Sequence, residues 1–161
     1  MRKHRTALRL TAATLLAAIC GWSAEAGSQG SSVSGIAKGI LMQPEPQYGT
    51  GFAHANLFAL GAGPDFTFRA KLTEIVSPCM SCREGDLDGT LDDGVGLGPD
   101  YLVKGHWIAN QVSGIGSFES LLYKASAPAD PPVGKLEAGF NDPPLPPGFA
   151  GPLSGSWILR R

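Results

Sequence analysis

The chain has few charged residues and no long apolar run, and each shortage excludes a class of protein. Charged side chains make up 17% of the 161 residues, below the roughly 25% usual in soluble domains. The basic residues form no cluster, which excludes nucleic acid as a partner. No stretch reaches the roughly 20 apolar residues of a transmembrane helix, so we expect no transmembrane anchor.

Helical periodicity is almost absent beyond residue 26, and cysteine is scarce. Gly or Pro interrupts every stretch of about a dozen residues, which excludes an ordinary helical domain. The whole chain has three cysteines, too few for a disulfide-dense scaffold.

The amino-terminal residues are typical of a cleavable secretory signal peptide. Four basic residues precede an apolar stretch from Leu10 to Cys20, and the tripeptide Ala24-Glu25-Ala26 follows. This order of charge, apolar core and small-residue site predicts removal of residues 1–26. We expect residues 27–161 to form a single domain that is secreted or periplasmic.

Cleavage would change both the charge and the cysteine count. It removes four of the 13 basic residues and one of the 14 acidic ones, which leaves a net charge of about −4. It also removes Cys20, so Cys79 and Cys82 remain. In an oxidising compartment this pair should form a disulfide. We interpret it as a structural clip and not a redox pair, because no helix can begin there to activate a thiolate.

Alternation of apolar and polar residues predicts β-strands along most of residues 27–161. In the clearest strand, 66–75, Phe66 and Phe68 face one side while Thr67 and Arg69 face the other, as in a half-buried strand. The other predicted strands are 33–42, 50–60, 85–91, 101–111, 115–124, 135–140 and 153–159. Proline-rich segments at 126–132 and 143–152 predict loops, since proline cannot donate to a ladder.

The strand count predicts an all-β fold. About eight strands can close into a small antiparallel barrel, with a β-sandwich as the alternative. Both tryptophans, Trp107 and Trp157, are expected to turn into the core or a barrel mouth. An outer-membrane barrel is disfavoured, because charges occur on both faces of the strands.

Acidic residues gather between residues 84 and 100. The six are Glu84, Asp86, Asp88, Asp92, Asp93 and Asp100. Calcium binds several carboxylates at once, but in the register of a calcium loop Val95 stands where a bidentate Glu belongs. We therefore predict a solvated acidic loop and no firm metal site. The weak calcium candidates are Glu84, Asp86, Asp88 and Asp92.

One short motif resembles a catalytic loop. Asp86-Leu-Asp-Gly-Thr-Leu91 is similar to the nucleophile loop of haloacid dehalogenase-type phosphatases, in which the first Asp attacks phosphorus. That loop follows a buried apolar strand, whereas polar residues 81–85 precede it here. We interpret the segment as an exposed strand whose Asp side chains face water.

The remaining candidate ligand-binding residues are His54, His106 and Trp107, each placed on a predicted strand. They form no recognisable catalytic set, so we expect a non-catalytic exported domain with a binding or structural role and no cofactor. One alternative is a small barrel enzyme or carrier that holds an apolar ligand. Another is an envelope or surface assembly component. The sequence does not identify the ligand, the partner or the oligomeric state.

Overall fold

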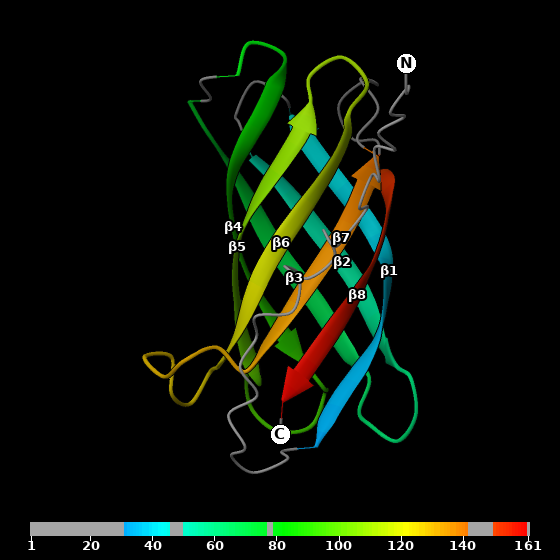
Figure 1. Cartoon of the computed structure of the whole chain (residues 1–161), viewed down its shortest axis with the longest axis vertical. Coiled ribbons are helices and arrows are strands. Elements are labelled where there is room, and N and C mark those ends of the chain that lie inside the picture. Colours follow the sequence, from blue (N-terminus) through cyan, green and yellow to red (C-terminus); the bar gives the residue numbers. More distant parts are fainter. Residues whose placement is uncertain (1–30, 46–49, 77–78, 142–149, 161) are drawn as a thin grey trace, which may run out of the picture.

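The computed structural model describes residues 31–45, 50–76, 79–141 and 150–160, and these form a closed barrel of antiparallel strands (Figure 1). The strands are β1 (Ser32–Glu45), β2 (Thr50–Ala59), β3 (Phe66–Ile75), β4 (Cys82–Asp92), β5 (Tyr101–Asn110), β6 (Ile115–Lys124), β7 (Gly134–Asn141) and β8 (Ala150–Arg160). The predicted all-β antiparallel barrel is confirmed, and closure excludes the sandwich. The predicted signal peptide lies outside the described residues.

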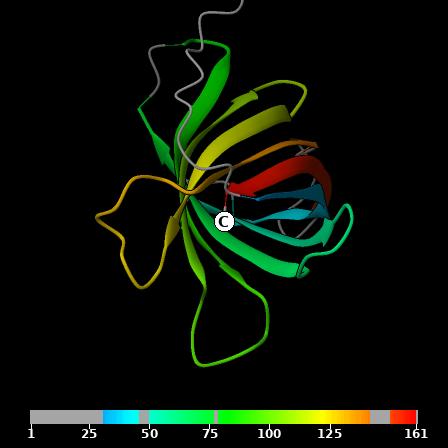
Figure 2. The same ribbon diagram turned by 60° about the horizontal axis from the view of Figure 1, so that its bottom comes forward.

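The barrel closes where the first strand meets the last. β1 and β8 pair antiparallel from Ser32 opposite Arg160 to Met42 opposite Ala150. Every described strand therefore has two neighbours, and no sheet edge is left open to another chain. The turns β3–β4 and β5–β6 lie at one end of the barrel. The β2–β3, β4–β5 and β6–β7 loops lie at the other end, which Figure 2 brings forward.

One predicted loop is partly wrong. We assigned 143–152 to a loop, but residues 150–152 belong to β8. Pro152 lies opposite Ile40 of β1, while the pairing of β8 with β7 begins only at Leu153. Pro152 thus sits at the end of a ladder, where a missing N–H group is tolerated.

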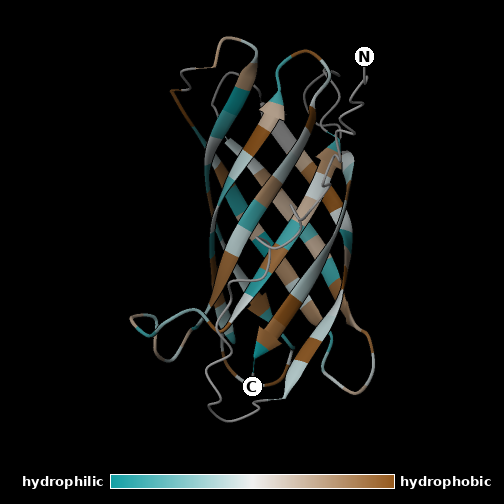
Figure 3. Cartoon of the chain, viewed as in Figure 1, coloured by the Kyte–Doolittle hydropathy of each residue, from teal (hydrophilic) through white to brown (hydrophobic). Residues whose placement is uncertain are grey.

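The interior of the barrel is a packed apolar core. Twenty-two apolar side chains, at least two from every strand, are buried there, and polar residues alternate with them along the strands (Figure 3). The one buried polar side chain among the described residues, Ser120, donates its hydroxyl to the Leu136 carbonyl at 2.8 Å. This apolar lumen is the opposite of the polar lumen of an outer-membrane barrel. Among the described residues there is also no helix able to cross a bilayer.

Glycines make room for the two tryptophans. Trp107 faces Gly85 across β4 and β5, and Trp157 faces Gly35 across β8 and β1. A Cβ atom on Gly85 would lie 2.8 Å from the Trp107 Nε1 atom, which is too close for any side chain. Neither indole Nε1 has a hydrogen-bond partner within the described residues, so the rings stabilise the core without a hydrogen bond from the indole nitrogen.

Side chains also close the two ends of the lumen. At the end with the β3–β4 turn, Arg83 donates from Nη2 to the Glu74 carboxylate at 2.7 Å and from Nε at 3.1 Å. Its guanidinium lies 5.9 Å from the centre of the Trp107 ring. At the other end Phe66 contacts Tyr101 and Trp157 edge to face, with ring centres 5.8 and 5.5 Å apart. Both tryptophans are buried in the core, as predicted, and they lie at its opposite ends.

Candidate functional site

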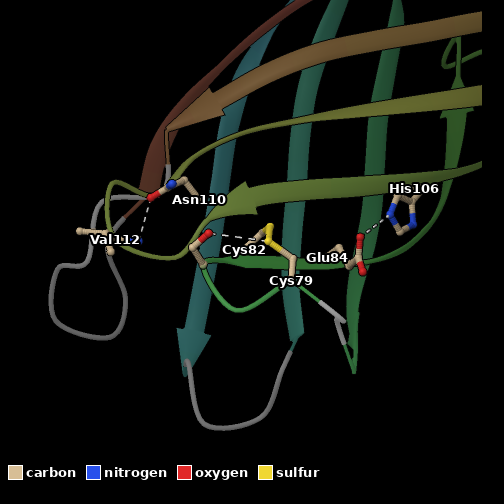
Figure 4. Close-up of a disulfide and its surroundings, with 7 residues drawn as sticks. Cys79, Cys82, Glu84, His106, Asn110 and Val112 are labelled. Atoms are coloured by element: carbon tan, nitrogen blue, oxygen red, sulfur yellow. Dashed lines mark hydrogen bonds and ion pairs between the residues drawn. A yellow bond between two sulfur atoms is a disulfide. The ribbon is translucent and has the colours of Figure 1, made fainter.

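The predicted ligand-binding residues do not converge. His54 points outward from β2 and His106 points outward from β5, while Trp107 points inward and is only 3% exposed. His106 Nε2 lies 3.6 Å from a carboxylate oxygen of Glu84 (Figure 4). These three residues therefore form no common pocket.

Cys79 and Cys82 form the predicted disulfide at the turn between β3 and β4 (Figure 4). Their Cα atoms are 5.3 Å apart, within the usual range for a disulfide. Met80, between them, is fully exposed. The bond closes a short ring at a barrel end, as expected of a local clip.

The acidic residues separate into two groups. Glu84, Asp86 and Asp88 point outward along β4, where alternate residues stand about 7 Å apart. Ligand oxygens of Asp92, Asp93 and Asp100 instead lie within 4.8 Å of one another. All three carboxylates accept backbone N–H groups of the loop, at 2.8 Å from Gly94, Val95 and Asp93 respectively. Their hydrogen bonds thus account for the cluster as part of the loop, and the absence of a firm metal site stays a prediction.

The outer surface of the barrel divides into two halves of different chemistry. On β4 to β7 the outward residues include six carboxylates, which are Glu84, Asp86, Asp88, Asp92, Glu119 and Glu137. On β8, β1, β2 and β3 none of the described outward side chains is acidic, and the cations are Lys38, Arg69, Lys71 and Arg160. We call these outward residues of β8, β1, β2 and β3 the basic–apolar wall.

The apolar residues of this wall are large, and most of them lie in two clusters. Six of them are 36 to 43% exposed and make up the clusters: Ile36, Ile40, Met42, Phe52, Phe58 and Ile158. A seventh, Ile75, is 43% exposed and lies apart from them, opposite Glu84. Ile36 lies opposite Phe58, and Met42 lies opposite Phe52. Elsewhere on the strands, exposed apolar residues such as Ile108 and Leu121 do not face each other across a strand pair. Clustered exposed apolar residues are the usual mark of a binding surface.

A groove of about 470 Å³ crosses this wall from β1 to β4. One side carries Phe52, Lys71 and Asp88, which lie opposite one another on β2, β3 and β4. The other side carries His54, Arg69 and Thr90 in the same way, and Met42 extends the groove beside Phe52. Neither Arg69 nor Lys71 has a hydrogen-bond or ion-pair partner within the described residues.

The groove has a physical cause in the curvature of the wall. Its floor consists of Ala53, Ala70 and Gly89, which lie in register on adjacent strands. A Cβ atom on Gly89 would lie only 2.6 Å from the Cβ atom of Ala70. The inward positions of this segment therefore crowd together, which requires small residues, and the outward side chains spread apart.

A second hollow of about 310 Å³ lies on the acidic half, across β6, β7 and β8. Glu119 and Glu137 line it, and Lys135 pairs with both carboxylates. The pKa of Lys135 is raised, chiefly because its ammonium group donates a hydrogen bond to Glu137. None of the large exposed apolar side chains of the described residues lines this hollow. It therefore lacks the amphipathic lining of the first groove.

Sequence reasoning missed the groove, because its lining comes from four strands and depends on their register. The available signal was the absence of acidic residues from the outward positions of the first three predicted strands. No protein-family model matches the chain, and neither the curated proteins nor the solved structures include a significant match.

Proposed function

We propose that this protein is an exported, non-catalytic binding module that recognises an anionic amphiphile on the basic–apolar wall. The observation that carries the proposal is the pairing of unpartnered cations with exposed apolar side chains on one half of the barrel. Arg69 and Lys71 supply the charge, and Phe52 and Met42 supply the apolar contact. A molecule with an acidic head and an apolar tail matches both kinds of group.

The core argues for binding on the outside of the barrel. Large side chains such as Phe68, Phe118 and Leu122 fill the lumen and are at most 1% exposed. The ion pair between Arg83 and Glu74 lies over one end of it. A carrier that encloses its ligand needs a cavity of several hundred cubic ångströms. The packed core does not support a carrier of this kind.

One observation supports the alternative that the protein is an envelope or surface assembly component. Ile36, Phe58 and Ile158 form an exposed apolar cluster on the same wall, and such a cluster also suits a protein partner. The closed barrel offers no free edge strand among the described residues, so an assembly role would depend on side-chain contacts and not on strand addition.

Binding of decyl phosphate tests the proposed function. The chain from Gly27 onward, which contains all eight strands, is titrated by calorimetry with decyl phosphate below its micelle concentration. Replacing the two cations that line the groove (Arg69→Gln with Lys71→Gln) should weaken binding about 30-fold, since each cation contributes roughly 1 kcal/mol toward an anion. Added salt should also weaken binding.

The matched control removes the same charge from the other half of the barrel. Lys104→Gln with Lys135→Gln changes the net charge equally, and both residues lie outside the wall. Binding to this variant should stay close to that of the unaltered chain. Equal losses in the two double variants would contradict the proposal, and so would failure of the unaltered chain to bind both decyl phosphate and vesicles that contain phosphatidylglycerol.

A further inference from the structure

We infer that the groove across β1 to β4 seats one single-chain anionic amphiphile, with its acidic head between Arg69 and Lys71 and its apolar chain over Phe52 and Met42. This inference depends on the proposed function and narrows it from a whole wall to one site. It also fixes the direction in which the ligand lies.

The charge in the groove is asymmetric along its length. Arg69 and Lys71 both belong to β3, and Asp88 follows on β4. An anionic head can therefore reach two cations at β3 but meets a carboxylate if it moves on toward β4. Arg69 offers a planar guanidinium that can bind two oxygens of a phosphate or carboxylate at once.

The apolar lining occupies the opposite end. Phe52 on β2 and Met42 on β1 are paired in register and are 43% and 40% exposed. An aromatic ring beside a flexible thioether offers an adaptable surface for an alkyl chain. On the side that carries Phe52, the order of groups is therefore apolar at β1 and β2, basic at β3 and acidic at β4, which sets the head at β3 and the tail toward β1. His54 and Thr90 line the other side of the groove.

The groove is an open surface hollow with room for a small ligand. About 470 Å³ lies in the lower part of the range of small-molecule sites. The floor is formed by the inward-facing Ala53, Ala70 and Gly89, which leaves no side chain standing in the groove. One ligand of modest size fits, with a single chain and one acidic head.

Two phenylalanines on one strand provide a matched test of the position. Phe52 and Phe58 both point outward from β2 and are 43% and 41% exposed, but Phe58 lies outside the groove. Phe52→Ser should weaken decyl phosphate binding about tenfold, as expected for loss of a large apolar contact. Phe58→Ser should change it less than about twofold. Equal effects of the two substitutions would overturn the groove as the binding site. The proposed function, binding somewhere on the basic–apolar wall, would still stand.

A charge substitution provides a test in which binding should improve. Asp88→Asn removes the carboxylate from the β4 end of the groove and should tighten decyl phosphate binding about threefold, as expected for removal of one exposed repulsion. Asp86→Asn, one outward position away on the same strand and outside the groove, is the control and should have a smaller effect. A folding defect cannot produce tighter binding. An equal gain from both substitutions would contradict the inference.

Vesicles distinguish a single molecule from a membrane surface. The groove should bind monomeric decyl phosphate but not inorganic phosphate, which lacks the chain. If vesicles containing phosphatidylglycerol bind and the monomer does not, the wall recognises anionic amphiphiles only in a membrane surface. That result overturns the single-molecule site while the proposed function stands. If neither probe binds, both fail.

Discussion

At the scale of single residues, Gly85 shows how closely the core is packed. Its missing Cβ atom leaves room for the Trp107 ring and for the carbonyl oxygen of Thr73. Gly85→Ala should therefore force the backbone or the ring to shift and lower the free energy of unfolding by about 1–3 kcal/mol. Chemical denaturation followed by tryptophan fluorescence measures this change.

Gly139→Ala is the matched control for that substitution. The nearest atom to a Cβ atom there would be the Gly116 carbonyl oxygen at 3.8 Å, an ordinary contact distance. The added methyl group should leave the free energy of unfolding unchanged or raise it by about 0.5 kcal/mol, because alanine restricts the unfolded chain. Equal destabilisation by the two substitutions would show that crowding against Trp107 is not the cause.

At the scale of strands, the disulfide between β3 and β4 gives a second prediction. The ring closed by Cys79 and Cys82 is short, so replacing both with Ser should lower the free energy of unfolding by at most about 2 kcal/mol. The barrel should stay folded, because each of the two strands keeps its ladder to both of its neighbours. The denaturant dependence of unfolding, with and without a reducing agent, measures the loss.

The reducing agent supplies the control for this prediction. It should shift the unfolding of the natural chain to that of the double variant and leave the double variant unchanged. Loss of the folded barrel on reduction would contradict this prediction, because it would show that the whole fold depends on the disulfide.

The bounds of a strand are predictable from sequence where apolar and polar residues alternate along it. The bounds of β3 were predicted as observed, because polar and apolar residues alternate from Phe66 to at least Thr73. β4 extends beyond the predicted 85–91, because Cys82 and Arg83 continue the ladder with β5 and Asp92 continues the ladder with β3. Pairing across strands cannot be read from one strand alone. The groove was unpredictable for the same reason, because Phe52 and Lys71 become neighbours only through register.

At the scale of the whole molecule, closure of the barrel places the start of β1 beside the end of β8. Ser32 lies opposite Arg160 in the β1–β8 ladder, so a turn of about two to five residues can join them. New ends can then be opened between Asp130 and Pro131, in the exposed β6–β7 loop. This circular permutant should fold, because it keeps every strand and every ladder. Circular dichroism should show its β-sheet, and thermal unfolding should remain cooperative.

A second permutant tests whether the closed ladder is what the fold requires. Opening the chain between Ser120 and Leu121 cuts β6, which pairs there with both β5 and β7. It also divides a strand that buries Phe118 and Leu122. This variant should show no cooperative transition, whereas the loop permutant should keep binding decyl phosphate, because its groove lies on β1 to β4. Similar stability of the two permutants would mean that the core holds the barrel together without continuous strands.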